Sequence, residues 1–148
     1  MGNIVFNQAL GRVASLAALP AANDALVAVP LEAAGLVTDA TMRDYDDLAA
    51  LLAGASNEQT TMGRKTLASV TVTVDDTNDR VAIDCADITW TAATGNAVGA
   101  VVICYDPDTT TGTDADLIPL TKHDLSLTPD GNNFTLTVAD FFRASSAA

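Results

Sequence analysis

The sequence predicts a mainly β protein, an antiparallel β-sandwich or barrel-like domain with one short α-helix at about residues 40–53 and an N-terminal arm. Two observations predict this class. After about residue 63, alternating Thr/Val and other β-type runs are separated by turns rich in Asp, Gly and Asn. Before that point the chain is rich in Ala and Leu and contains one clear helical pattern.

We expect a single domain over residues 1–148, because a chain of this length can bury a core of its own. Its predicted parts are an N-terminal segment that includes the arm (1–20), a strand plus the helix (21–62), the β-sandwich core (63–144) and a short tail (145–148).

The segments before the helix are less regular. Residues 1–20 fit two descriptions, since "NQALGRVASLAAL" has helical spacing whereas "NIVF" and Gly11 also fit an extended arm. The next segment, "DALVAVPLEAAG", predicts a short strand. We place it at the edge of a sheet because Pro30 has no N–H to donate to a neighbouring strand.

The helix is predicted from "TDATMRDYDDLAALLAG", residues 38–54. One face is apolar at helical spacing and comprises Met42, Tyr45, Leu48, Ala49 and Leu52. Thr38, Asp39 or Thr41 can cap its start, and Gly54 can end it in the left-handed conformation. The opposite face is charged, so we expect the helix on the outside of the fold.

Strands follow from residue 67 onward. "LASVTVTV" alternates strictly, with Val70, Val72 and Val74 on one face. "RVAIDCADITW" changes its alternation near Ala86 or Asp87, which indicates a bulge or a bend between sheets.

"VGAVVICY" is apolar on both faces and predicts a central strand. "LIPLTKHDLSL" and "NFTLTV" flank "TPDGN", which predicts a hairpin turn. Five or six strands are expected after residue 66.

Charge and hydropathy exclude several partners. The net charge is −12, and 17 of the 19 acidic residues are Asp, a residue typical of turns and caps. Such a chain is not expected to bind nucleic acid, which requires clustered cations. The longest apolar run, residues 97–105, is about half the length of a membrane-spanning helix, and the N-terminus has no signal-peptide pattern.

Residues able to carry catalysis are few. Cys85 and Cys104 lie in apolar runs and are expected to be buried thiols rather than a disulfide, as in a chain made in the cytosol. His123 is the only histidine and is expected to be structural. No metal-binding, nucleophile or phosphate-loop spacing is present, so we expect no enzyme activity and no cofactor.

One loop resembles a calcium site in composition. "DPDTTTGTDAD" carries Asp106, Asp108, Asp114 and Asp116, but glycine and the bidentate acid do not fall at the sixth and twelfth positions of an EF-hand. A different calcium arrangement of these four aspartates stays open. The simpler interpretation is a polar loop between two strands.

Three long blocks make up most of the chain: "LPAANDALVAVPLEAAGLVTDATMRDYDDLAALLAG", "RKTLASVTVTVDDTNDRVAIDCADITWTAA" and "VICYDPDTTTGTDADLIPLTKHDLSLTPDGNNFTLTVADFFRAS". These blocks resemble a family of small, mostly unannotated virion proteins of tailed bacteriophages. They cover nearly the whole chain, and the similarity is one of block order rather than of a catalytic motif.

The resemblance implies a capsid decoration or cement protein on the outer surface of the phage head. The implied partners are the major capsid protein and further copies of the chain, as a homotrimer, after synthesis in the host cytoplasm. Candidate interface residues are Phe6 in the arm and the adjacent Phe141 and Phe142, which cannot both face inward along one strand.

Three alternative functions stay open. A tail, neck or fibre module would share the fold but be present in few copies. A calcium-dependent surface-binding module would use the Asp-rich loop. An enzyme is the least supported class.

Overall fold

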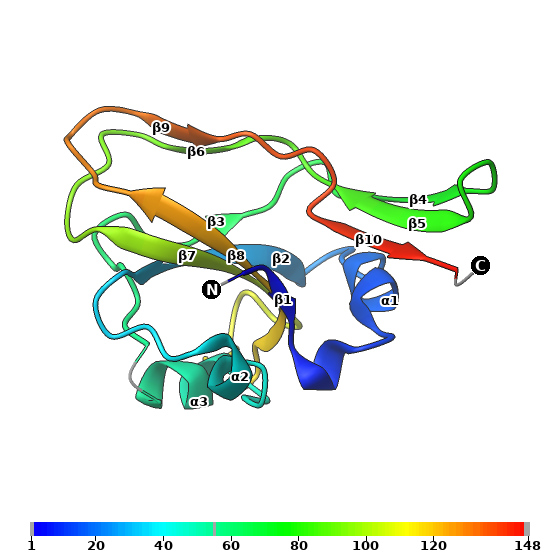
Figure 1. The fold of residues 1–148 in the computed structure, drawn as a ribbon, viewed down its shortest axis with the longest axis horizontal. Helices are drawn as coiled ribbons and strands as arrows, with labels where there is room; N and C mark the ends of the chain where they lie inside the picture. Colours follow the sequence, from blue (N-terminus) through cyan, green and yellow to red (C-terminus); the bar gives the residue numbers. More distant parts are fainter. Residues whose placement is uncertain (1, 55, 147–148) are drawn as a thin grey trace.

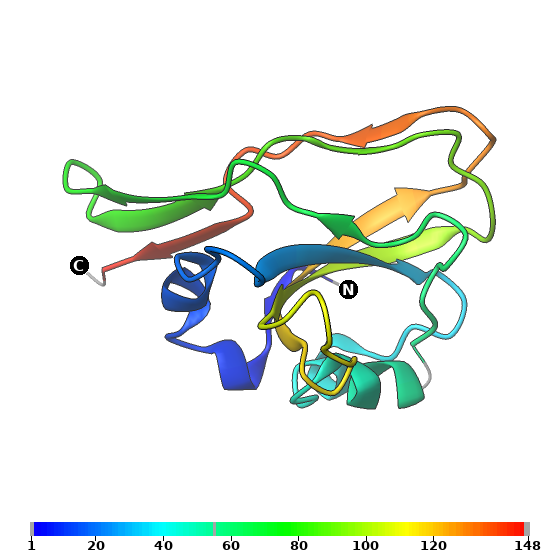
Figure 2. The same cartoon turned by 180° about the vertical axis from the view of Figure 1, so that it is seen from behind.

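The computed structural model describes residues 2–54 and 56–146, and it confirms a mainly β, antiparallel fold. The sheets form a sandwich-like arrangement that is not closed into a barrel (Figures 1 and 2). The strands are β1 (Ile4–Val5), β2 (Ala25–Glu32), β3 (Lys65–Thr66), β4 (Thr71–Asp75), β5 (Arg80–Asp84), β6 (Ile88–Trp90), β7 (Val98–Asp106), β8 (Ile118–Leu127), β9 (Phe134–Leu136) and β10 (Phe142–Ser145). The helices are η1 (Asn7–Ala9), α1 (Val13–Ala17), α2 (Asp39–Met42) and α3 (Leu48–Ala53).

The main sheet has the order β1-β8-β7-β2-β3. β7 lies at its centre and is almost entirely buried, which confirms the prediction of a central strand. Helices α2 and α3 lie on one side of this sheet and the β6–β9 pair on the other (Figure 1). The sheet takes strands from both sides of residue 62, because β1 and β2 join β7 and β8.

The second layer is one long ribbon with a bulge. β5 and β6 follow each other along one strand of the ribbon, and β10 and β9 run antiparallel beside them. Four residues separate the paired positions Ile83 and Ile88, but five separate Leu136 and Phe142, so the second strand carries one extra residue. The predicted change of alternation near residues 86 and 87 is confirmed, since Ile83 and Cys85 are buried before this point and Ile88 and Trp90 after it.

Two carboxylates hold the bulge. Asp140 has a left-handed backbone, with φ of 56°. Its N–H donates to Asp84 at 3.2 Å, and the N–H of Val138 donates to Asp87 at 2.9 Å. These side chains replace the backbone acceptors that a regular ladder would supply.

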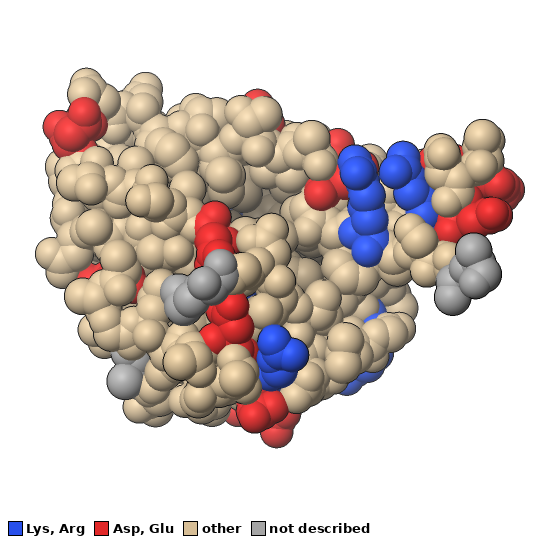
Figure 3. Space-filling view, viewed as in Figure 1, with Lys and Arg blue, Asp and Glu red and all other residues tan. Residues whose placement is uncertain are grey.

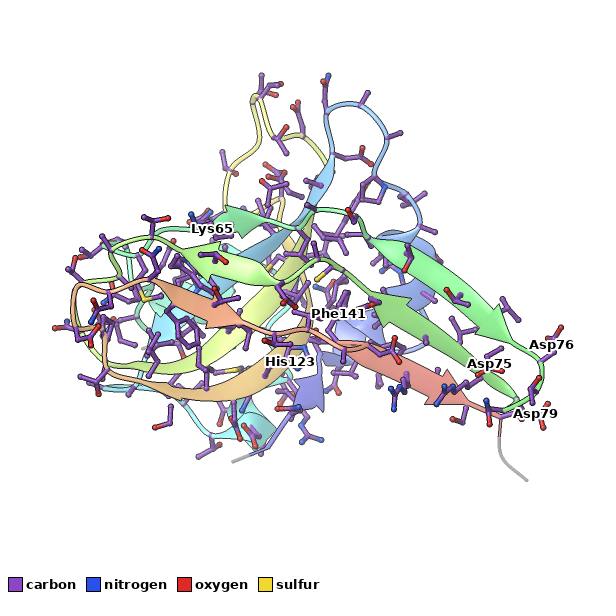
Figure 4. All side chains as sticks on the ribbon, turned by 90° about the horizontal axis from the view of Figure 1, so that it is seen from above. Lys65, Asp75, Asp76, Asp79, His123 and Phe141 are labelled. Carbon is purple, nitrogen blue, oxygen red and sulfur yellow. The ribbon has the colours of Figure 1, made fainter. Side chains whose placement is uncertain are left out.

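The ribbon extends beyond the body as a three-stranded sheet of order β10-β5-β4 (Figure 1). Helix α1 lies beneath its base, and the four-residue turn 76–79 forms its tip (Figure 4). Val72 packs against the core, whereas Val74 is 68% exposed because it lies farther along the projection.

The prediction of one continuous helix over residues 40–53 is wrong. The segment forms two short helices, α2 and α3, separated by a turn. Thr38 caps α2 as predicted, but Asp47 caps a second start by accepting from the Ala50 N–H at 2.7 Å. Gly54 does not adopt the left-handed conformation. Its φ is −79°, and a Cβ at this position would lie 1.9 Å from the Tyr45 hydroxyl.

The N-terminal segment is not an extended arm. β1 pairs with β8, and η1 and α1 fold against the body. Its buried side chains are Phe6, Ala9, Val13, Leu16 and Ala17. The helical description of residues 7–19 is therefore closer than the extended one, because this spacing buries an apolar face.

Two strand relationships also differ from prediction. β2 is not an edge strand, since β3 covers it at Val27 and Ala28, and Pro30 lies beyond that short contact. β8 and β9 do not form a hairpin, because β9 pairs with β6 in the other layer. Ten strands are present among the described residues, seven of them after residue 66, and residues 147–148 of the predicted tail lie outside the described part. No helix in the described part of the chain is long and apolar enough to cross a membrane.

Candidate functional site

A cavity of about 200 Å³ lies between the two layers, below the bulge of the ribbon. β7 contributes Val101 and Ile103, β8 contributes His123, and the bulged segment contributes residues 136–141. A second hollow of about 200 Å³ lies on the other side of Phe141 and His123, toward β1. The surface is hollowed in this region, between β8 and the β9–β10 connection (Figure 3).

His123 and Phe141 separate the two hollows. Their rings meet edge to face, with centroids 6.3 Å apart and planes at 88°. Nε2 of His123 lies 2.9 Å from the Thr121 hydroxyl. Burial lowers the pKa of His123 below its ordinary value of 6.5, and the neighbouring charge of Lys122 acts in the same direction.

The cavity contains no activated nucleophile among the described residues that line it. Cys85 is the one thiol in its wall, and burial raises the pKa of that thiol to about 11. Cys104 is completely buried in the main sheet, and burial raises its thiol pKa further. Both cysteines are free, so the prediction of buried thiols is confirmed. Neutral thiols are poor nucleophiles.

The structure does not bring the four aspartates of the 106–116 loop together as a cation site. In the described part of the chain, no three His, Cys, Asp or Glu side chains gather in an arrangement that could hold a metal ion. Asp106 accepts from the Asp108 N–H at 3.1 Å, and Asp116 accepts from the N–H and hydroxyl of Thr113, both at 2.9 Å.

The remaining two aspartates of that loop are also occupied. Asp108 accepts from the hydroxyls and N–H groups of Thr110 and Thr111, and these bonds hold its pKa well below the usual range. Asp114 forms an ion pair with Arg64 at 2.6 Å. The aspartates therefore shape the loop by local hydrogen bonds, a role that their composition alone does not distinguish from calcium binding.

Two charged clusters were not anticipated. Arg64 bridges Glu58 and Asp114, both at 2.6 Å. Lys122 is fully buried, and its ammonium donates to Asp39 at 2.8 Å and to Asp124. A lysine in an alternating strand predicts an exposed position, and only the fold brings Asp39, 83 residues away, to its ammonium.

The three aromatic interface candidates lie in different environments. Phe6 is fully buried in its own chain, so it contributes to the core and offers no surface to a partner. Phe141 and Phe142 are both half-buried and both pack against the core. The predicted alternation does not apply to this pair, because β10 begins at Phe142 and Phe141 precedes the strand.

The outer edge of β4 is one of the two outer backbone edges of the projecting sheet. β4 pairs with β5 on one side, and no described strand pairs with the other. The sheet and its tip project away from the body, with Asp75, Asp76 and Asp79 at the end (Figure 4). An unpaired, regular strand of β-branched residues is a surface suited to protein contacts.

Compared with known proteins, the chain matches no family model, no curated protein and no solved structure.

Proposed function

We propose that this chain is a structural protein of a tailed-phage virion, a decoration or cement protein that binds the major capsid protein on the outer surface of the head and stabilises the lattice. The observation that carries the proposal is the projecting β10-β5-β4 sheet with its unpaired β4 edge. The resemblance of residues 19–54, 64–93 and 102–145 to small virion proteins supplies the biological setting.

Surface charge supports this role. The net charge of −12 keeps copies of the protein soluble at high concentration and disfavours contact with nucleic acid. Acidic side chains lie at several separate places on the face shown in Figure 3, including the tip of the projection. A lattice protein that meets its neighbours through chosen edges benefits from repulsion elsewhere on its surface.

The chemistry of the interlayer cavity favours assembly over catalysis. Its thiol is neutral, and its histidine holds a proton weakly and contacts a threonine and a phenylalanine. The expected assembly on the capsid is a homotrimer on a threefold position, after synthesis in the host cytoplasm. This part of the proposal follows from analogy with decoration proteins in general.

Quantitative mass spectrometry of purified particles of the encoding phage tests the proposal. We expect a copy number of the same order as that of the major capsid protein, and particles that lack the protein should release their DNA at lower temperature. A few copies per particle, located at one vertex by imaging, would instead identify a tail, neck or fibre component.

A calcium-dependent surface-binding role is tested separately. If the loop bound calcium, the metal would raise the melting temperature and the double variant Asp106→Ala, Asp108→Ala would lose that increase. Each of the four loop aspartates already accepts a hydrogen bond or forms an ion pair. We therefore expect the protein to melt at the same temperature in calcium and in chelator.

A further inference from the structure

The outer edge of β4 combines three features. No described strand pairs with it, it contains no proline or basic residue, and it exposes Val74. Natural sheets usually protect such an edge with charges, prolines, bulges or a covering segment. Only three large hydrophobic side chains in the described chain are strongly exposed, and at 68% Val74 is the most exposed of them.

We propose that β4 is a contact between two copies of this chain, paired antiparallel across a twofold axis with Thr73 facing the partner's Thr73. This inference does not depend on the virion role, because it concerns the protein in solution. On a capsid, such twofold contacts could link trimers that assemble about threefold positions.

The β4 sequence is self-complementary in this register. Val72 lies opposite the partner's Val74, so the exposed valine of each copy is covered. Thr71 lies opposite the partner's Asp75, where a hydroxyl can donate to a carboxylate. No two like charges face each other across the pair.

Neighbouring registers are poorer. A centre on Val74 would place Thr71 and Val72 opposite residues 77 and 76 of the partner's turn, outside β4. A centre on Val72 would draw Ser69 into the ladder opposite the partner's Asp75, but Ser69 has a left-handed backbone with φ of 54°. Only the centre on Thr73 uses all five residues of β4.

Charge favours the same orientation. The acidic turn of each copy passes the start of the partner's β4 and points toward Lys65 on the partner's β3. Figure 4 shows Lys65 on β3 in the body of the molecule, beyond the start of β4, and the acidic residues at the opposite end of β4. Lys65 forms no ion pair with a described carboxylate, whereas Asp76 and Asp79 are exposed.

Mass measurement in solution tests the contact. The full chain is measured by sedimentation equilibrium at physiological ionic strength, where salt screens exposed charges over about 8 Å. We expect an even-numbered assembly whose mass is halved by Val74→Glu, because the two glutamates would lie diagonally across the axis. Leu10→Glu is the matched control, since Leu10 is 61% exposed and follows η1, which packs against β8, and it should leave the mass unchanged.

Charge reversal tests the orientation. Lys65→Glu should weaken the association at least several-fold, and adding Asp76→Lys to it should restore the association. All variants should retain the far-ultraviolet circular dichroism spectrum of the wild type, because the substituted side chains lie at the surface or at a strand edge.

Disulfide trapping tests the register. Thr73→Cys should form a covalent dimer on oxidation, whereas Thr77→Cys in the turn should not. Both native cysteines are buried and do not compete. The proposal is overturned by a monomeric or odd-numbered wild-type assembly, by a Val74→Glu mass equal to the wild type, or by trapping at residue 77 in preference to residue 73.

Discussion

The buried ammonium of Lys122 provides a sharp test of the electrostatics of this fold. Its side chain is 0% exposed, while those of Asp39 and Asp124 are 20% and 36% exposed. The cluster is therefore asymmetric: the cation depends on its partners, whereas the carboxylates retain contact with water. Removing the cation should therefore cost much less stability than removing the two carboxylates.

Two variants separate these costs. The double variant Asp39→Asn, Asp124→Asn keeps the side-chain sizes but leaves the buried ammonium without a counter-charge, which should cost about 3–5 kcal/mol. For a domain of this size that corresponds to a fall in melting temperature of roughly 10 °C. Lys122→Met removes the cation at similar volume and leaves two hydrated carboxylates, so it should cost only about 1 kcal/mol.

Urea unfolding followed by circular dichroism measures both values. In the wild type, the hydrogen bond from Lys122 lowers the pKa of Asp39. Its contribution is present above the unfolded value of 3.8 and is lost as pH falls through the folded value. Equal losses in Lys122→Met and the double variant would refute the reasoning.

Further predictions concern the cavity, the thiols and a close contact. Because burial lowers the pKa of His123, stability should fall as pH drops below about 6.5, and His123→Gln should remove that slope in urea unfolding measured across this range. Both cysteine thiols should react with a thiol reagent only at the rate of unfolding, and rapid reaction in the native protein would contradict their burial. Gly54→Ala should cost about 1–3 kcal/mol in the same assay, because its Cβ would collide with the Tyr45 hydroxyl, whereas Gly2→Ala meets no atom within 4 Å and should be neutral.

Strand propensities were predictable from sequence because they are local. Alternation between polar and apolar residues identified β4, and an unbroken apolar run identified β7 as a central strand. The cap at Thr38 followed in the same way from a side chain close to its own backbone. The break between α2 and α3 was not predicted, because Asp47 fits the sequence pattern equally well as an exposed residue inside one helix and as the cap of a second helix.

Strand partners were not predictable by these means. The "TPDGN" segment contains hairpin residues, yet it carries the chain from β8 to β9 in the other layer. A backbone donor pairs with any carbonyl that packing brings near, whatever the distance along the chain. The local sequence of a turn therefore constrains its backbone angles but not the destination of the strand that follows.

The candidate site was likewise only partly predictable from sequence. The aspartates of the 106–116 loop could be read as calcium ligands or as turn residues, and only the fold shows each of them accepting a hydrogen bond or an ion pair. Phe141 and Phe142 cannot both face inward along one strand, but β10 begins only at Phe142, and both side chains pack against the core. Neither outcome is encoded in a short stretch of residues.

The sequence by itself determined the fold class, most of the segments that become strands, the burial of both thiols and the acidic surface, since each depends on composition or on short-range periodicity. Tertiary structure alone decided that Lys122 meets Asp39, that a cavity forms beneath the bulge, and that β4 ends with one edge unpaired. These features depend on which distant segments share a layer, and that choice is made by packing of the whole core rather than by any local preference.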